Sequence, residues 1–306
     1  MAESKFLLIK SITAGMWHEM HHVITQLLAA EILKRIPVVY WGRESLYAVK
    51  DRSNAFEQFF LPVSDYNLKD LTSENLSFFP EKWNHSNLSA AVPVQNRNTA
   101  PAMEAWTECR ADVLVQDTYV DVEQIIPYIP VGHPFYGYNC RDLLHGMINK
   151  YIRLRKDVLE GINSFYNKNM NGTPMLAVHI RSSDKAVEVR NLQELNDRYP
   201  LEINRFIREN PSIRIFLMTD CIEILEEYKK IYGEILFHTD CKRVPQNGPG
   251  VHFQEYPDNM IKGFEIILDT WLAAKCDFFI GNGYSNVSLA ISELKDWQKH
   301  QIKLLY

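Results

Sequence analysis

Residues 178–185 carry the densest set of reactive side chains in the sequence, because the apolar run V-H-I is followed by R-S-S-D-K. If this run is a strand of an open α/β sheet, its charged end lies where such sheets bind ligands. Arg181 can donate two parallel hydrogen bonds to diphosphate oxygens, and Lys185 can add a second positive charge. The alternative is a surface cluster in which Arg181 pairs with Asp184. The segment therefore indicates an anion site or, failing that, a charged surface.

Three further segments place polar groups where a strand or helix could present them. Asp220 follows Thr219 at the end of the apolar run 213–218. Residues 281–286 (G-N-G-Y-S-N) lead from a strand into a helix, where backbone N–H groups and the Ser285 hydroxyl can bind phosphate. Asp269 lies in the middle of a helical pattern, close to its apolar side. Ordinary explanations stay open here, with Ser285 as a helix N-cap and Asp269 as an exposed flank residue.

The start of the chain offers a different chemistry, because residues 18–22 match the H-E-x-x-H pattern. On a helix, His18 and His22 share a face and can bind zinc, with Glu19 as the general base of a hydrolase. No further histidine nearby completes a metzincin pattern, and Glu44 is a forced choice of third ligand. We therefore interpret the motif as the polar start of a helix, predict no metal site, and keep a zinc hydrolase as an alternative.

Strand-like and helical patterns alternate along both halves of the chain, which is typical of parallel α/β sheets. The first half has a strand, a loop at Gly15, a helix and a second strand, with one more strand later; the ranges are 5–11, 17–34, 37–41 and 112–116. The second half has four strands, at 174–180, 213–218, 234–238 and 277–280, and three helices, at 222–231, 259–275 and 286–294.

Two other segments decide the domain prediction. Residues 62–105 read as an irregular insertion, and a single helix is expected over 140–167, ending near Gly172. We therefore predict two lobes, 1–170 and 171–306, that face each other across a cleft.

The composition is that of an ordinary globular protein, with 306 residues, 46% of them hydrophobic and 23% charged. A net charge of −5 and the lack of a long Lys/Arg run argue against a nucleic-acid or anionic-membrane surface. No apolar stretch approaches the about 18 residues of a membrane helix. Five cysteines without a C-x-x-C pair favour free thiols in a reducing compartment. We therefore expect a cytoplasmic protein.

The motifs described above resemble the α-1,6-fucosyltransferase and protein O-fucosyltransferase superfamily, which includes the rhizobial nodulation fucosyltransferases. The resemblance covers both lobes but is thin from about 45 to 170. It rests on H-x-R-x-x-D-K at 179–185, T-D at 219–220, I-L-D at 267–269, A-K-C-D-F-F-I at 274–280, Y-S-N-V at 284–287, and Gly15 with H-H-V at 21–23. It implies the GT-B fold, two Rossmann-like lobes, and GDP-fucose as a donor substrate bound mainly by the C-terminal lobe, without a cofactor.

The resemblance also implies roles for single residues. Arg181 would hold the β-phosphate and stabilise the leaving GDP, and His179 and Asp269 would recognise the nucleoside. The phosphate donors and the rest of the donor site would come from Ser285, the Gly15 loop, Asp184 and Asn286. The sequence departs from the core-fucosylating members at Ser182 and Cys221, where they have a second Arg and a second Asp. Glu188 lies near, but not at, the position of the family's carboxylate.

The mechanism that follows is an inverting displacement, in which an acceptor hydroxyl of a glycan attacks C1 of fucose as GDP leaves. Glu188, tuned by Lys185, is the first candidate for the base and Asp220 the second. The sequence contains no D-x-D motif, so a Mg²⁺- or Mn²⁺-dependent reaction is not expected. Two alternatives besides the zinc hydrolase stay open: a GT-B transferase with another nucleotide sugar, and a glycan-binding protein without activity.

Overall fold

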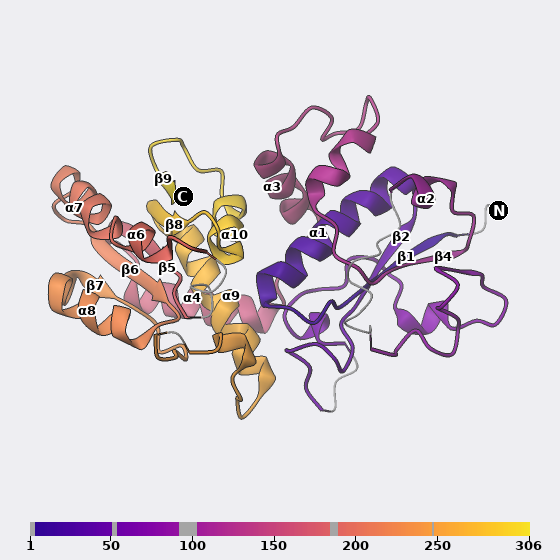
Figure 1. Ribbon diagram of the computed structural model, residues 1–306, viewed down its shortest axis with the longest axis horizontal. Helices are drawn as coiled ribbons and strands as arrows, with labels where there is room; N and C mark the ends of the chain where they lie inside the picture. Colours follow the sequence, from indigo (N-terminus) through magenta and orange to yellow (C-terminus); the bar gives the residue numbers. More distant parts are fainter. Residues whose placement is uncertain (1–3, 51–53, 92–102, 184–188, 247) are drawn as a thin grey trace. The chain divides into compact units, whose positions relative to one another are not determined.

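The computed structural model describes residues 4–50, 54–91, 103–183, 189–246 and 248–306 (Figure 1). The chain divides into two compact units, Met1–Arg155 with Asp258–Met260, and Lys156–Pro257 with Ile261–Tyr306. This division lies ahead of α4 (Lys156–Asn169), whereas the sequence places it after that helix. The physical reason is packing, because the Phe165 ring of α4 contacts Phe237 in the second unit, with 5.7 Å between ring centroids.

The first unit is built on a four-stranded parallel sheet of order β2-β1-β4-β3. Its strands are β1 (Phe6–Lys10), β2 (Ile36–Tyr40), β3 (Phe78–Phe79) and β4 (Val113–Gln116). Helix α1 (Met16–Leu33) joins β1 to β2, and β1 pairs with β2 in parallel register, so the predicted βαβ unit is confirmed. The short β3 was not predicted. It lies in the segment expected to be irregular, and only two residues of it pair with β4.

The expectation of one helix over 140–167 is wrong, because the structure has two helices there, α3 (Cys140–Tyr151) and α4. The chain turns extended at Ile152, where ψ is 103°. Leu154 then forms an antiparallel bridge with Phe60, and the Arg155 N–H donates to Phe59 O at 2.9 Å. These backbone contacts with a distant segment interrupt the helix. The other helices of this unit are short: α2 (Met103–Glu108) and the 3₁₀ turns η1 (Phe56–Gln58), η2 (Leu68–Leu71), η4 (Val122–Gln124) and η5 (Ile126–Tyr128).

The second unit is built on a five-stranded parallel sheet of order β7-β6-β5-β8-β9. Its strands are β5 (Met175–Ile180), β6 (Arg214–Thr219), β7 (Leu236–Phe237), β8 (Phe278–Asn282) and β9 (Ile302–Leu305). Its remaining helices are α6 (Leu192–Asn196), α7 (Tyr199–Glu209), α8 (Ile222–Tyr232), α9 (Asn259–Lys275), α10 (Asn286–Leu294), η6 (Gly233–Ile235) and η7 (Val251–Phe253). Four of the strands were predicted, whereas β9, α6 and α7 were not.

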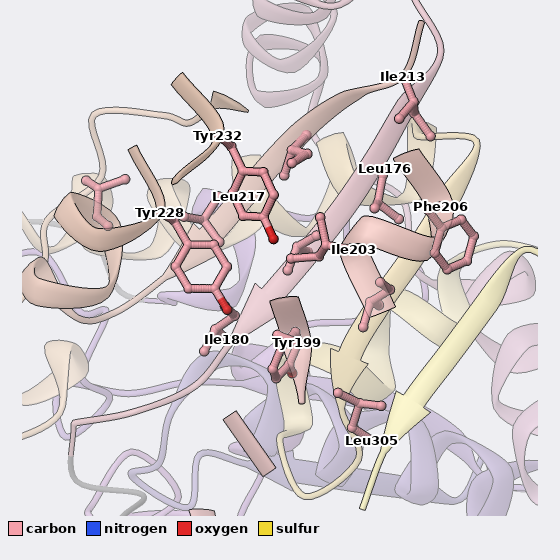
Figure 2. Packing of buried hydrophobic residues seen from close by; sticks show 14 of the residues in the cluster. Leu176, Ile180, Tyr199, Ile203, Phe206, Ile213, Leu217, Tyr228, Tyr232 and Leu305 are labelled. Carbon is pink, nitrogen blue, oxygen red and sulfur yellow. The ribbon is translucent and has the colours of Figure 1, made fainter. Parts of the chain in front are cut away.

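One face of this sheet is covered by α6, α7 and α8 (Figures 1 and 2). Leu176, Val178 and Ile180 of β5 belong to a buried cluster with side chains of those helices, among them Tyr199 and Tyr228. Because successive side chains of a strand point to opposite faces, His179 between them lies on the other face. That face carries α10, whose Ser288 hydroxyl lies 2.7 Å from His179 Nδ1. The hydrophobic core thus fixes which residues of β5 are left to build a site.

Two expectations about the whole chain can be compared with the structure. All five cysteines are free thiols, as predicted. Among the residues that the structure describes, no helix has the length and apolar character needed to cross a membrane.

Candidate active site

The polar strand ends singled out in the sequence lie together at one edge of the second unit's sheet. In the parallel register, Ile180 is opposite Thr219, and His179 is opposite Gly281. The residues that follow β5, β6 and β8 therefore emerge side by side. Residues 181–183, Asp220 and the loop after Gly281 thus share one edge of the sheet.

Arg181 and Asp220 form the central ion pair of this edge, with Arg181 Nη1 bonded to Asp220 Oδ2. The same carboxylate accepts the Ser182 N–H at 2.9 Å and the Ser183 hydroxyl. Both side chains of the pair are largely buried, at 16% and 10% exposure. Asp220 therefore fixes both the guanidinium and the turn that follows β5. The sequence instead offered Asp184 as the partner, and Asp184, Lys185 and Glu188 lie outside the described residues.

Two polar side chains that sequence reasoning missed hold the backbone at the end of β5. The Tyr199 hydroxyl donates to His179 O at 2.7 Å, and Asn196 Nδ2 donates to Arg181 O at 3.2 Å. Ser183 has φ of +30°, a backbone conformation that side-chain-bearing residues rarely adopt. At this turn the Ser183 hydroxyl donates a hydrogen bond to the Asp220 carboxylate. A Tyr and an Asn in two unpredicted helices gave no sequence signal for these contacts.

His179, two residues before Arg181 in the sequence, is buried, at 6% exposure. Burial, together with the nearby Arg181 charge, lowers the pKa of His179 to about 3. The imidazole is therefore neutral at physiological pH. Its Nδ1 lies 2.7 Å from the Ser288 hydroxyl, a partner that the sequence analysis did not identify.

The loop after β8 is held by Asn282, which is fully buried. Asn282 Oδ1 accepts the Tyr284 N–H at 2.8 Å, and Asn282 O accepts the Ser285 N–H at 3.0 Å. Ser285 stands at the N-cap of α10, but its side chain makes no capping hydrogen bond to the helix. The ordinary N-cap explanation therefore does not describe its hydroxyl. Asn286 begins α10, so both residues lie at the helix start that was expected to meet phosphate.

Asp269 of α9 is partly buried rather than an exposed flank residue. Its Oδ1 accepts the Thr239 hydroxyl at 2.7 Å and lies 3.6 Å from Cys241 Sγ. Burial raises the pKa of Asp269 to about 6, although Thr239 and Arg243 both favour the charged form. Arg243 holds this loop by donating to Thr239 O at 3.0 Å and Cys241 O at 2.7 Å. The only sequence signal for Thr239 was its place directly after a predicted strand.

The H-E-x-x-H segment serves a structural role in the first unit. Glu19 is fully buried, and its carboxylate accepts the Ser11 hydroxyl at 2.7 Å and the backbone N–H groups of Ile12 and Ala14. Burial raises the pKa of Glu19 to about 7, and these hydrogen bonds oppose that shift. A carboxylate bound in this way has no access to the water molecule that a hydrolase base must activate. This geometry argues against the zinc alternative.

The same contacts order the loop that contains Gly15. Gly15 is the N-cap of α1, and its carbonyl accepts the N–H groups of His18 and Glu19 at 2.9 and 3.0 Å. The His18 ring lies against Tyr119, with 4.3 Å between centroids. Within the described ranges, no group of three or more His, Cys, Asp or Glu side chains is placed to hold a metal ion.

Comparisons with known proteins give a fold but no sequence relative. No family model matches the chain, and no curated protein matches its sequence. A fucosyltransferase NodZ from Bradyrhizobium is similar in structure, with a TM-score of 0.58 and 18% identity over 94% of this chain and 92% of that one. A NodZ α-1,6-fucosyltransferase crystal soaked with GDP-fucose gives a TM-score of 0.60 and 18% identity, over 99% and 98%.

POFUT1 in complex with GDP-fucose is similar over 99% of this chain and 97% of that one, with a TM-score of 0.59 and 12% identity. The chain therefore has the GT-B fold of the α-1,6- and protein O-fucosyltransferases, in agreement with the fold predicted from its motifs.

Proposed function

We propose that this chain is a glycosyltransferase that moves fucose from GDP-fucose to a hydroxyl of a glycan acceptor, with inversion at C1. The observation that carries the proposal is the Arg181 guanidinium, fixed by Asp220 at the carboxyl end of β5. The fold adds support, because it is shared with a NodZ α-1,6-fucosyltransferase whose crystal was soaked with GDP-fucose and with POFUT1 in complex with GDP-fucose.

The leaving diphosphate needs positive charge and hydrogen-bond donors fixed in advance. As the bond between C1 and the phosphate oxygen breaks, its electron pair moves onto the β-phosphate, and Arg181 stabilises the growing charge. The Ser285 hydroxyl and the N–H groups at the start of α10 supply further donors at the neighbouring strand end. A guanidinium held by an ion pair needs little reorganisation during the reaction, so it lowers the barrier effectively.

The nucleoside is assigned to Asp269 and His179. In its charged form, Asp269 accepts hydrogen bonds from guanine N–H groups, which a uracil ring does not present in the same arrangement. The neutral imidazole of His179 can offer its Nε2 to the nucleoside, because Nδ1 is paired with the Ser288 hydroxyl. We also assign Asp184 and Asn286 to the donor site, as the resemblance implies.

The acceptor hydroxyl must lose a proton as its oxygen bonds to C1. Asp220 is poorly suited to take it, because both of its oxygens are engaged by Arg181, Ser182 and Ser183. We assign Asp220 the positioning of Arg181 and keep Glu188 as the base, with Lys185 three residues before it in the sequence. Because arginine and backbone donors carry the charge of the leaving group, we propose that transfer needs no divalent cation.

Isothermal titration calorimetry with GDP, UDP and ADP tests the donor. Binding of GDP with at least tenfold preference supports the proposal, and tighter binding of UDP would make this a GT-B transferase of another nucleotide sugar. Release of GDP from labelled GDP-fucose, measured with chitin oligomers, lipopolysaccharide fragments and peptides, tests the acceptor. Transfer to none of them, with no donor hydrolysis, would favour a glycan-binding protein instead.

A further inference from the structure

We propose that Ser288 is a positioning residue that holds His179 in the tautomer with its proton on Nε2, and thereby presents an N–H donor to the bound nucleotide. The identity of that nucleotide rests on the proposed function. The tautomer itself rests only on contacts within the second unit.

The Ser288 hydroxyl has two partners among the described residues. The backbone N–H of Asn282 donates to Ser288 Oγ at 2.9 Å, so in this contact the oxygen is the acceptor. The second partner is His179 Nδ1, at 2.7 Å. Ser288 is fully buried, so water does not compete for its proton. The hydroxyl proton therefore goes to His179 Nδ1.

The opposite arrangement leaves a buried donor unused. If His179 Nδ1 carried the proton, Ser288 Oγ would accept from both neighbours, and its own proton would have no acceptor among the described residues. Leaving a buried donor unpaired is costly, which selects the first arrangement. A neutral imidazole carries one N–H, so accepting at Nδ1 places that N–H on Nε2. Burial keeps the ring neutral by lowering its pKa to about 3.

The close approach of Ser288 depends on the glycine opposite His179. A Cβ added to Gly281 would lie 2.6 Å from Ser288 Oγ and 2.5 Å from the Phe279 ring. His179 and Gly281 pair on neighbouring strands. Because Gly281 has no side chain, the Ser288 hydroxyl can approach the His179 imidazole. The orientation of the His179 imidazole thus depends on Ser288, on the Asn282 N–H and on the space left at Gly281.

Nitrogen-15 NMR of histidine-labelled full-length protein reads the tautomer directly. Two-bond correlations between ring protons and ring nitrogens show which nitrogen is protonated, and the His179→Gln variant assigns the signal. We expect an Nε2–H pattern in the wild type and a loss of that single pattern in Ser288→Ala. The control is Ser292→Ala, because Ser292 lies one turn further along α10, is also buried, and donates to Leu289 O at 2.6 Å. An Nδ1–H pattern in the wild type overturns the inference, even if the Ser288 variant fails to fold.

Calorimetry with GDP then tests the consequence. We expect about tenfold weaker binding in Ser288→Ala and unchanged binding in Ser292→Ala, as for other residues that orient a binding histidine. Equal affinity in the two variants would overturn the positioning role. If the wild type binds no GDP, the proposed function fails, and the NMR pattern alone decides the inference about Ser288.

Discussion

At the residue scale, the position of the Arg181 guanidinium is set by its ion pair with Asp220. An arginine at a strand end is usually flexible. Here the Asp220 carboxylate, at the end of the neighbouring strand, binds both the Arg181 guanidinium and the backbone of the turn that follows it. The pairing fixes the position of the guanidinium at this edge of the sheet. Preorganised charge of this kind is the largest single term in many enzymes that stabilise an anionic leaving group.

Replacing Arg181 with alanine should lower the rate of fucosyl transfer about 100-fold or more, because the leaving diphosphate loses its fixed positive charge. The measurement is the turnover of labelled GDP-fucose under saturating acceptor. Arg205→Ala is the matched control, since Arg205 is an exposed arginine of the same unit that pairs with Glu209. Near-normal turnover in Arg181→Ala would show that the role assigned to this residue is wrong.

The roles of Asp220 and Glu188 can be separated by their effect on donor binding. Asp220→Asn should weaken GDP binding about tenfold as well as slow transfer, because Arg181 loses its charged partner. Glu188→Gln should slow transfer and leave GDP affinity unchanged, because a base acts only on the acceptor. Calorimetry and turnover of both variants decide the matter. A transfer defect without a binding defect in Asp220→Asn would return Asp220 to the role of base.

GDP affinity should fall on acidification because of Asp269. Its folded-state pKa is raised to about 6, so it is mostly charged at pH 7 and mostly protonated at pH 5, where it no longer accepts from guanine. We expect about tenfold weaker binding at pH 5 than at pH 7, since each pH unit below the pKa removes a factor of about ten. Asp269→Asn should bind GDP weakly without this dependence and corrects for titration of the ligand phosphate. Parallel pH profiles of the two proteins would contradict the assignment.

At this scale, sequence reasoning identified strand ends but not the partners of their side chains. Arg181, Asp220 and Asp269 were singled out as candidates because ionisable groups that end or interrupt apolar patterns are conspicuous. Ser288 and Thr239 were not found, because a serine or threonine in a helix or loop has many ordinary uses. Which of them reaches a given imidazole or carboxylate depends on strand register and helix placement, which periodicity does not encode.

At the element scale, the site depends on how closely α10 approaches β8. Gly281 allows that approach, because any side chain there would meet Ser288 and the Phe279 ring. The helix start carrying Ser285 is thereby fixed at the same sheet edge as Arg181. A small residue at a strand end is thus as important to the geometry as the charged residues.

Gly281→Ala should destabilise the protein by about 1–3 kcal/mol, because its Cβ overpacks the contact between β8 and α10. The free energy of unfolding in urea measures this. Gly161→Ala is the control, since a Cβ at that position in α4 meets only the Phe264 ring, at 3.1 Å, and alanine favours a helix. Equal stability of the two variants would show that the sheet edge tolerates the added methyl group.

The elements found from sequence are those with a strong pattern of their own. The βαβ unit around α1 and the long helix α9 show clear periodicity, and α9 has the predicted bounds. The break between α3 and α4 could not be seen, because it is made by backbone contacts with Phe59 and Phe60, far away in the chain. β3 has only two residues, too few for a pattern, whereas the equally short β7 lies inside the strand predicted at 234–238.

At the scale of the whole molecule, the chain shares its fold with NodZ and POFUT1, although its sequence is only 18% and 12% identical to theirs. Such a fold tolerates extensive substitution, because it depends on which positions are buried more than on which residues fill them. The residues proposed to carry the chemistry lie mainly at a few strand ends of the second unit. The motifs were therefore enough to predict the fold class, whereas the irregular insertion at 62–105 gave almost no information.

A crystal structure of the protein with GDP tests the central claim most directly. The account predicts the diphosphate within hydrogen-bond distance of the Arg181 guanidinium and the first amides of α10, with the guanine at Asp269. GDP bound at any other place, or no binding at millimolar nucleotide, would contradict it.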